Sequence, residues 1–309
     1  MKIAIVGTGA TGSVYAGLLA SAGHEVWAID SWREHIEAVR DGGMHVSGAS
    51  GDRVATLNAT TDPGEVGVVD LVVIATKAHD VEDAARDAAP LLGEQTVVLP
   101  IQNGLGSADR VASIVGAERV IAGVIGGFGA SIVAPGHVHH YGMELVRLGE
   151  RGAPVSERVE RIAEAWREAG FTVRTYDNVD CLVWEKLICN VAFSGTCAVT
   201  GATIGEVIGN VAAWSVATTC ATEAYNVARA QGIALEFDDP SDYVREFGLA
   251  IAGARPSMLL DVLAGRRSEV DVINGAIPPL AARLGLAAPV NATVSALVRA
   301  IQRGVEAPP

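Results

Sequence analysis

The sequence predicts a protein of the α/β plus all-α class, with a doubly wound parallel sheet in a first domain and helices alone in a second. Three observations support this fold class. The chain has 309 residues, a length that suits about two domains. Half of the residues are apolar and only 19% are charged, which excludes a disordered chain. Short apolar runs alternate with helical patterns up to about residue 177, and only helical patterns follow.

The first domain, residues 1–177, is expected to alternate strands with helices. In chain order we predict a strand at Lys2–Val6, a helix at Ala10–Ala22, a strand at His24–Ile29, a helix at about Arg33–Arg40, a strand at Asp70–Thr76, a helix at about Val81–Leu92, a strand at Thr96–Pro100, a helix after Gly106, a strand near Arg119–Val124, antiparallel edge strands within His137–Leu148, a helix at Val155–Ala169 and a last strand at Phe171–Thr175. The β-branched run Asp70–Thr76 is typical of a central strand buried on both faces. We therefore expect a parallel sheet with helices on both sides.

The second domain, residues 178–309, is expected to be helical, because the hydrophobic period changes from 2 to 3.6 near residue 177. The predicted helices are Cys181–Val199, Val211–Gln231, Pro240–Ala254, Met258–Ala264, Glu269–Leu284 and Asn291–Arg303. Ser268 and Asp271 have the spacing of a capping box, which predicts that a helix begins there. Residues 187–205 carry no charge, but their polar side chains favour a buried core helix over a membrane span.

Charge and cysteine content favour a cytoplasmic protein without a nucleic-acid, membrane or metal partner. The formal net charge is −13, so no basic surplus exists to replace the counterions of a nucleic acid. The N-terminal apolar run Ile3–Val6 is too short for a signal peptide. Cys181, Cys189, Cys197 and Cys220 lack zinc-ligand spacing, and we interpret them as buried free thiols in a reducing compartment.

The strongest motif is the run Gly7-Thr8-Gly9-Ala10-Thr11-Gly12, between the first predicted strand and helix. In such a turn the first glycine permits a tight bend, the second lets the backbone approach a pyrophosphate, and the third permits close packing of helix on strand. The N–H groups of the helix N-terminus then bind the phosphates. Because strand, turn, helix and second strand occur in the expected order, we predict a Rossmann-like domain that binds a dinucleotide.

Asp30 ends the second predicted strand, 18 residues after Gly12. A carboxylate there accepts hydrogen bonds from both ribose hydroxyls of NAD and repels the 2′-phosphate of NADP. Arg33 would instead be able to bind that phosphate, and an ordinary surface-loop aspartate is the structural alternative for Asp30. The sequence thus predicts NAD or NADP as the cofactor, with NAD slightly favoured.

Polar residues follow two further predicted strands at the edge where ligands bind in open α/β sheets. Thr76-Lys77 follows the central strand, and Gln102-Asn103-Gly104 follows the next one. An Asn-Gly pair is ordinarily a turn. Its position at this edge leads us to expect that the Asn103 amide contacts the nicotinamide or the substrate.

The helical domain contains a lysine in apolar surroundings. In the run Trp184-Glu185-Lys186-Leu187-Ile188-Cys189-Asn190, Lys186 and Asn190 are four residues apart and share one helix face. A lysine held away from water has a lowered pKa and is able to act as a general acid near neutral pH. The alternative is a lysine whose stem is buried while its amine reaches the solvent.

Together these residues resemble the ketopantoate reductases (2-dehydropantoate 2-reductases), within the wider 6-phosphogluconate dehydrogenase-like group. The resemblance covers nearly the whole chain. It rests on the order and spacing of the glycine run at residues 7–12, Thr76-Lys77, Gln102-Asn103-Gly104, Trp184-Glu185-Lys186 with Asn190, Pro256-Ser257-Met258, and Ser268-Glu269-Val270-Asp271 with Asn274-Gly275. It implies a second domain of the 6-phosphogluconate dehydrogenase C-terminal type and an NAD(P)-dependent oxidoreductase of pantothenate biosynthesis. We also expect a homodimer, since the apolar helices of residues 187–222 are able to bury against a second subunit as readily as within one.

The resemblance also implies a role for each site residue. Lys186 resembles the general acid that protonates the keto oxygen, and Asn103 and Glu269 resemble groups that contact both cofactor and substrate. The implied substrate ligands are Asn190, Ser194 and Ser257, and the implied cofactor contacts are Gly7, Thr8, Gly9, Ala10, Thr11, Gly12, Asp30, Thr76, Lys77, Asn103, Glu269 and the backbone at Ala130.

Two positions depart from the family pattern. Ser194 replaces an asparagine that often follows one turn after the first, which shortens the polar reach toward the substrate. Asp30 stands where the NADP-dependent reductases have a basic residue. Alternatives are therefore an NAD-preferring 2-hydroxy acid dehydrogenase of the same family, and a non-catalytic protein that senses NAD(P)H. An enzyme of the hydroxyisobutyrate or phosphogluconate type is disfavoured, because its lysine and asparagine are closer together than Lys186 and Asn190.

Overall fold

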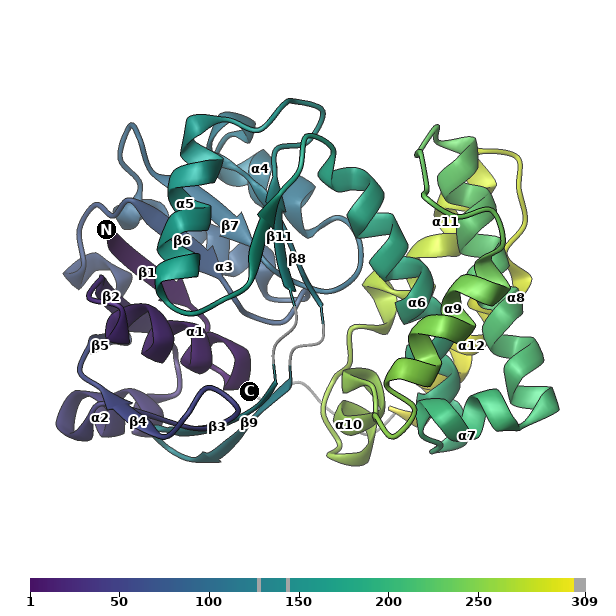
Figure 1. Cartoon of the computed structure of the whole chain (residues 1–309), viewed down its shortest axis with the longest axis horizontal. Helices are drawn as coiled ribbons and strands as arrows, with labels where there is room; N and C mark the ends of the chain where they lie inside the picture. Colours follow the sequence, from purple (N-terminus) through teal and green to yellow (C-terminus); the bar gives the residue numbers. More distant parts are fainter. Residues whose placement is uncertain (127–128, 143–144, 303–309) are drawn as a thin grey trace. The chain divides into compact units, whose positions relative to one another are not determined.

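The computed structural model describes residues 1–126, 129–142 and 145–302, and it divides the chain into two compact units (Figure 1). Unit 1 comprises Met1–Gln102 and Gly106–Val179, and unit 2 comprises Asn103–Leu105 and Asp180–Pro309. The division falls two residues after the boundary expected from the sequence. The assignment of cofactor to the first domain and substrate to the second stays a prediction.

Unit 1 is built around a parallel five-stranded sheet. Its strand order is β5-β2-β1-β6-β7, with β5 at Asn58–Thr60, β2 at Glu25–Ile29, β1 at Lys2–Val6, β6 at Leu71–Ile74 and β7 at Val97–Pro100. The order changes direction between β1 and β6, which makes the carboxyl ends of these two strands the switch point at which ligands bind in such sheets. Gly7 directly follows β1, and Thr76 lies two residues after the end of β6.

Helices cover both faces of this sheet, as predicted. The α-helices of unit 1 are α1 (Ala10–Ser21), α2 (Arg33–Gly42), α3 (Val81–Asp87), α4 (Ser107–Val115) and α5 (Glu157–Glu168), and its 3-10 helices are η1 (Pro63–Glu65), η2 (Ala89–Leu91) and η3 (Ala117–Arg119). Ile3 and Ile5 of β1 pack into one hydrophobic core, while Ala4 and Val6 pack into a second core on the other face. This alternation is the period of two that a strand requires.

Two small sheets complete unit 1. The first has the order β4-β3-β10-β9, with β4 at Arg53–Ala55, β3 at Met44–Gly48, β10 at His137–Gly142 and β9 at Gly129–Ala134. The second has the order β12-β11-β8, with β12 at Val173–Thr175, β11 at Leu145–Gly149 and β8 at Ala122–Gly126. Strands β3, β4, β5 and β9 were not predicted from the sequence. The antiparallel edge strands expected within residues 137–148 are correct only in part: β10 and β11 each have an antiparallel neighbour, but each lies between two other strands of its sheet and not at an edge. These short strands pair with distant segments, and a local pattern does not report such partners.

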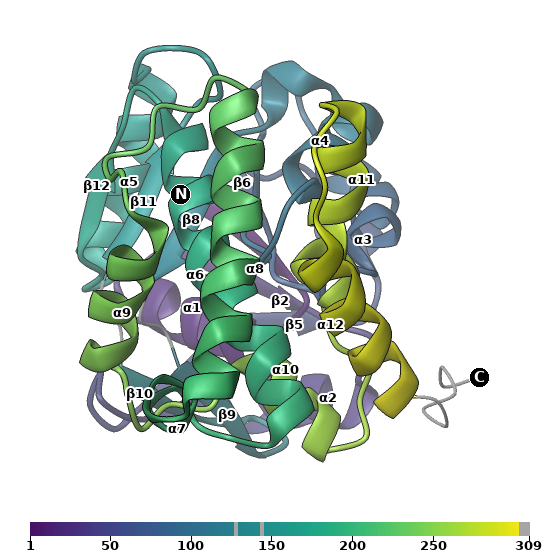
Figure 2. The ribbon, with the colours of Figure 1, turned by 90° about the vertical axis from the view of Figure 1, so that its right-hand side faces the viewer.

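Unit 2 consists of helices and the loops that join them, with no strand among its described residues. Its helices are α6 (Val179–Thr200), α7 (Ile204–Gly209), α8 (Val211–Ala230), α9 (Pro240–Ala250), α10 (Ser257–Leu263), η4 (Val270–Val272), η5 (Asn274–Ala276), α11 (Ile277–Arg283) and α12 (Pro289–Ile301). Within the unit, α11 and α12 pack against α8 (Figure 2). One helix among the described residues, α6, is long and apolar enough to span a membrane, and 72% of its most apolar window is buried inside the protein. This burial agrees with the predicted core helix.

The predicted helix at residues 269–284 and its capping box are wrong. The segment consists of η4, η5 and the short helix α11, and the backbone turns away from helical geometry at Ile273 (φ −104°, ψ −101°). The Ser268 hydroxyl donates to the Gln302 side chain, and Asp271 pairs with arginines. Pro278 lacks the N–H that a continuous helix needs, so α11 begins with that proline in its first turn.

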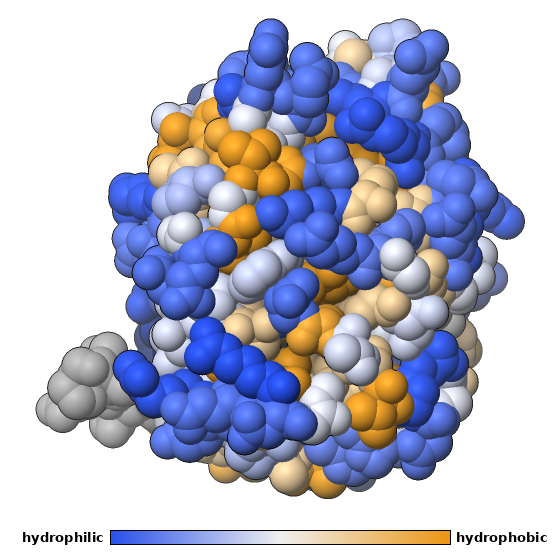
Figure 3. Space-filling view, turned by 90° about the vertical axis from the view of Figure 1, so that its left-hand side faces the viewer, coloured by the Kyte–Doolittle hydropathy of each residue, from blue (hydrophilic) through white to orange (hydrophobic). Residues whose placement is uncertain are grey.

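The cysteines are free and buried, as predicted. Burial raises the pKa of each of the four thiols to about 12, so none of them is a ready nucleophile at neutral pH. The face of the molecule in Figure 3 is mainly hydrophilic, with several apolar groups between the hydrophilic ones.

Candidate active site

The glycine turn at the end of β1 is held by backbone packing. Gly7 has φ +91°, and a Cβ there would lie 2.6 Å from the Thr76 backbone nitrogen. A Cβ at Gly12 would lie 2.1 Å from the Gly7 carbonyl oxygen, so α1 packs directly on the turn. By contrast, nothing lies within 4 Å of a Cβ at Gly9. Gly7 and Gly12 therefore serve packing, while the backbone at Gly9 is open, as the predicted approach of a pyrophosphate requires.

Polar atoms without partners collect around this turn. Among the residues that the structure describes, the buried Oγ1 atoms of Thr8 and Thr76 and the buried Oε1 atom of Gln102 have no hydrogen-bond partner. The Gln102 amide nitrogen donates to the carbonyl oxygens of Ile74 (2.8 Å) and Thr76 (3.1 Å), which fixes the side chain at this edge. Buried polar atoms are normally paired. The unpaired atoms at the switch point thus suit the phosphates, ribose or amide of a dinucleotide.

Asp30 follows β2 and its carboxylate is oriented by the next turn. One carboxylate oxygen, Oδ1, accepts a hydrogen bond from the backbone nitrogen of Trp32 (2.9 Å). Asp30 is partly buried, while Arg33, the first residue of α2, is exposed. This orientation is compatible with the role expected from the sequence, in which the carboxylate binds ribose hydroxyls.

Two other predicted cofactor contacts lie on unit 1. Lys77 follows β6 and is partly buried. Ala130 belongs to strand β9, where it is paired with His140 of β10, rather than to the five-stranded sheet that carries the glycine turn. Nothing in the geometry of unit 1 assigns Ala130 to the cofactor, so its contact stays a prediction.

One face of α6 carries three predicted site residues at four-residue spacing. Lys186 and Asn190 are partly buried, and Ser194 is 4% exposed. The intervening Leu187, Ile188 and Cys189 belong to the hydrophobic core of unit 2. The helix therefore presents an amine, an amide and a hydroxyl in a row from an otherwise apolar segment.

A buried series of hydrogen bonds through Asn274, Asn291 and Glu223 connects α6 to α8 and α12. The Asn274 amide nitrogen donates to the Val191 carbonyl oxygen of α6 (2.7 Å) and to the Asn291 side-chain oxygen (3.0 Å). The Asn291 amide nitrogen in turn donates to the Glu223 carboxylate (2.7 Å). The same carboxylate accepts from the backbone nitrogens of Val290 and Asn291 (2.9 Å each), and so caps the N-terminus of α12.

The structural roles of Glu223, Asn291 and Asn274 were not predicted from the sequence. Asn274-Gly275 was noted only as part of the family pattern. The available signals were a carboxylate in the apolar run of α8 and an asparagine two residues after the proline that starts α12. Each of these polar side chains, placed in a buried helix face, requires a partner.

The predicted residues Asn103 and Glu269 lie on two segments that are joined by hydrogen bonding. The Leu105 backbone nitrogen donates to the Val272 carbonyl oxygen (2.9 Å), and a Cβ at Gly104 (φ +82°) would lie 2.3 Å from the same oxygen. Glu269 immediately precedes η4 and is 8% exposed. Ser257, the first residue of α10, is exposed. Asn103-Gly104 thus lies in a bend whose glycine has a positive φ, and the bend is joined to the segment that carries Glu269.

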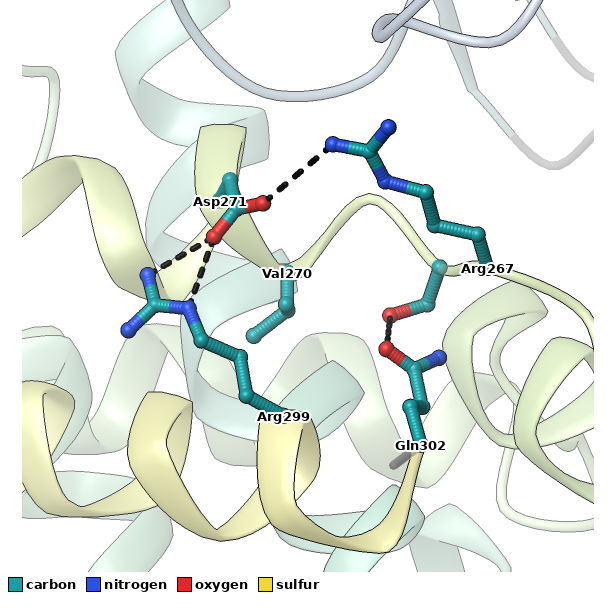
Figure 4. Close-up of a pocket in the computed structure, with 6 residues that line it drawn as sticks. Arg267, Val270, Asp271, Arg299 and Gln302 are labelled. Atoms are coloured by element: carbon teal, nitrogen blue, oxygen red, sulfur yellow. Dashed lines mark hydrogen bonds and ion pairs between the residues drawn. The ribbon is translucent and has the colours of Figure 1, made fainter. Parts of the chain in front are cut away.

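Unit 2 contains a pocket of about 180 Å³ that is separate from the Lys186 face (Figure 4). Its lining residues are Arg267, Ser268, Val270, Asp271, Arg299 and Gln302. Asp271 accepts from Arg299 (2.8 Å from Nε) and is 3.8 Å from Arg267, so the two guanidinium groups approach one carboxylate from different sides. These contacts tie η4 to α12, and no predicted site residue lines the pocket.

The fold and these residues define a nicotinamide-dependent oxidoreductase. The family model described as "Ketopantoate reductase PanE/ApbA" matches residues 3–153, and its C-terminal counterpart matches residues 178–302. The 2-dehydropantoate 2-reductase of Archaeoglobus fulgidus is 32% identical over 98% of this chain and 99% of its own. The chain belongs to the ketopantoate reductase family.

Solved structures agree with this assignment. The ketopantoate reductase of Ralstonia eutropha JMP134 has a TM-score of 0.90 and 33% identity, covering 99% of both chains. A D-mandelate dehydrogenase solved with NADH and anilino(oxo)acetate has a TM-score of 0.89 and 27% identity, again over 99% of both chains. The predicted fold class and family are confirmed.

Proposed function

We propose that this chain transfers a hydride between NAD(H) and a 2-keto or 2-hydroxy acid, with Lys186 as the general acid and base. The observation that carries the proposal is the α6 face, where the partly buried Lys186 lies one turn before Asn190 and two turns before Ser194 in an apolar helix. A positioned amine that exchanges a proton with a reacting oxygen is a general acid–base catalyst.

When bound, the nicotinamide supplies or accepts the hydride at the substrate's second carbon. In the reductive direction Lys186 gives a proton to the keto oxygen, which becomes the hydroxyl, and the neutral amine then regains a proton from water. Asn190, Ser194 and Ser257 donate hydrogen bonds to the substrate's oxygen atoms. Asn103 and Glu269 orient the reacting groups from the two hydrogen-bonded segments.

The cofactor site is assigned to the glycine turn and the ends of β2, β6 and β7. Gly7, Thr8, Gly9, Ala10, Thr11 and Gly12 would hold the pyrophosphate, Asp30 the adenosine ribose, and Thr76 and Lys77 the remainder of the cofactor. The oriented Asp30 carboxylate supports NAD over NADP. The NADH in the related D-mandelate dehydrogenase structure supports the same preference, although the ketopantoate reductase family is NADPH-dependent.

Two substrates are candidates for this reaction. Relatives named 2-dehydropantoate 2-reductase favour ketopantoate and a role in pantothenate biosynthesis. The structural similarity to D-mandelate dehydrogenase, together with Ser194 and Asp30, favours another 2-hydroxy acid. Steady-state kinetics with NADH and NADPH over ketopantoate, benzoylformate and unbranched 2-keto acids separates the two. A kcat/KM highest for ketopantoate supports the reductase, and no turnover of any 2-keto acid would contradict the proposed reaction.

The aspartate provides a test of cofactor choice. Asp30→Ala removes the carboxylate that repels a 2′-phosphate, so the ratio of kcat/KM for NADH to that for NADPH should fall about tenfold, equivalent to roughly 1.4 kcal/mol. An unchanged ratio would show that Asp30 does not select the cofactor.

We also propose that the enzyme is a cytoplasmic homodimer. Support comes from apolar side chains left exposed on unit 2, such as Val211 at the start of α8 and Leu263 at the end of α10. The four unpaired cysteines are compatible with a reducing compartment. Light scattering during size-exclusion chromatography tests the dimer, and a monomer at all concentrations would overturn it.

A further inference from the structure

A buried histidine lies beside the glycine turn, and its role is not part of the reaction proposed above. His35, in α2, has no exposed surface. Both of its ring nitrogens have partners from other elements. Nδ1 is 3.1 Å from the backbone nitrogen of Gly136, in the turn between β9 and β10, and Nε2 is 3.2 Å from the Ser13 hydroxyl of α1.

These partners determine which nitrogen carries the proton. The Gly136 backbone N–H is able only to donate, so Nδ1 must accept and the ring proton must be on Nε2. Nε2 then donates to the Ser13 hydroxyl, and that hydroxyl donates to the Thr8 carbonyl oxygen at 2.7 Å. A directional series of hydrogen bonds therefore runs from Gly136 through His35 and Ser13 to Thr8.

The series ends inside the cofactor turn. Thr8 lies between Gly7 and Gly9, and Ser13 follows Gly12. The Trp32 ring, which follows Asp30, stacks on His35 with ring centroids 4.9 Å apart and planes 18° apart. His35 thus contacts residues next to both places where unit 1 would hold the dinucleotide, the pyrophosphate turn and the ribose carboxylate.

We propose that His35 is a positioning residue for cofactor binding: through Ser13 it fixes the Thr8 carbonyl, and thereby the conformation of the glycine turn, in the geometry that receives the pyrophosphate. The proposal rests on the cofactor site assigned above and adds residues outside the glycine motif to it. Because a bound phosphate needs backbone N–H groups in one fixed arrangement, release of the Thr8 carbonyl should weaken cofactor binding more than it slows the chemical step.

This series of hydrogen bonds requires a neutral His35 imidazole. A protonated ring would carry a hydrogen on Nδ1, where it would face the Gly136 N–H. Burial lowers the pKa of His35, and the Asp30 carboxylate partly opposes this by raising it. The groups that face the ring are Asp30 and Trp32 from the end of β2, the Ser13 hydroxyl from α1 and the Gly136 amide from the β9–β10 turn. The neutral form is therefore the one present at neutral pH.

The test is a titration of the full-length protein with NADH, followed by fluorescence. His35→Leu and Ser13→Ala each interrupt the series of hydrogen bonds, and each should raise the Kd for NADH about three- to tenfold, the size expected for one hydrogen bond. Because both changes interrupt the same series, the double variant should bind NADH about as weakly as either single variant. His35→Gln keeps an N–H that is able to reach Ser13, so it should retain most of the affinity.

Two further readouts distinguish positioning from a loss of stability. In His35→Leu the KM for NADH should rise while kcat at saturating NADH changes by less than about twofold. The wild-type Kd should also rise as the pH falls through the pKa of His35, which burial lowers from the ordinary histidine value of about 6.5, and His35→Gln should lack this rise.

Thr96→Val is the matched control. Thr96 is also buried, and its hydroxyl donates to the Val69 carbonyl (2.6 Å) and accepts from the Gly93 nitrogen (2.8 Å), but it precedes β7 at the opposite end of the sheet. It should lower stability and leave the Kd for NADH unchanged.

The proposal is overturned if Ser13→Ala binds NADH as tightly as the wild type, if the two single effects add in the double variant, or if Thr96→Val raises the Kd equally. If His35→Leu does not fold, Ser13→Ala and His35→Gln decide the matter. Wild-type protein that does not bind NADH would instead overturn the cofactor site on which the proposal rests.

Discussion

The two units hold their candidate site residues by different physical means. In unit 1 the glycine turn is fixed by backbone contacts, since a Cβ at Gly12 would lie 2.1 Å from the Gly7 carbonyl oxygen. In unit 2 the α6 face is held by side chains, because Asn274 donates to the Val191 carbonyl and Asn291 to the Glu223 carboxylate. The contact between Gly12 and Gly7 joins residues of one motif, whereas these two hydrogen bonds in unit 2 join residues 83 and 68 positions apart.

The largest effect is expected for Lys186, the residue that carries the amine on the α6 face. Lys186→Ala removes the proposed general acid, so kcat should fall on the order of 10²–10⁴-fold with a smaller change in cofactor affinity. Steady-state kinetics and an NADH titration measure the two quantities. Lys2→Ala, at a lysine that donates to the Val66 carbonyl in unit 1, is the control and should keep normal kcat. Near-normal turnover by Lys186→Ala would refute the assignment of Lys186.

A second pair of variants tests the backbone support in unit 1. Gly12→Ala forces a Cβ against the Gly7 carbonyl, and overpacking of this kind costs about 1–3 kcal/mol of unfolding free energy. Gly9→Ala places its Cβ in open space, so stability should not change, but the Kd for NADH should rise roughly tenfold because the methyl group occupies the approach of the pyrophosphate. Urea denaturation and NADH titration measure both variants. If Gly9→Ala binds NADH normally, the pyrophosphate does not lie there.

A third pair tests the side-chain support in unit 2. Asn274→Ala removes the donor to the Val191 carbonyl, and we expect kcat to fall about tenfold, equivalent to 1.4 kcal/mol, as the α6 face shifts. Glu223→Gln removes the negative charge at the cap of α12 but keeps an amide oxygen that is able to accept from Asn291, so the hydrogen bond from Asn274 to Val191 should persist. It should lower the melting temperature and keep kcat within about twofold. If Asn274→Ala and Glu223→Gln are equally stable and lose kcat equally, Asn274 has only a structural role.

The same contrast explains how much the sequence could predict. Strands β1, β2, β6 and β7 and the helix with Lys186 depend on local patterns, and the bounds predicted for them are within two residues of those in the structure. Strands β3 and β9, the partners of Asn274 and the contacts of His35 depend on pairings between distant segments. The prediction of one helix over 269–284 is wrong for a related reason, because Asp271 pairs with Arg299 of the distant α12. In addition, Pro278 prevents a continuous helix.

The central claim is that Lys186 exchanges the proton with the substrate's oxygen. The most direct test is the pH dependence of hydride transfer in a single turnover, followed by NADH absorbance at saturating keto acid, in the wild type and in Lys186→Ala. The wild-type rate should decline at alkaline pH, where lysine loses its proton, and the variant should be slow and should lack that decline. Two identical profiles, equal in rate and in shape, would contradict the account.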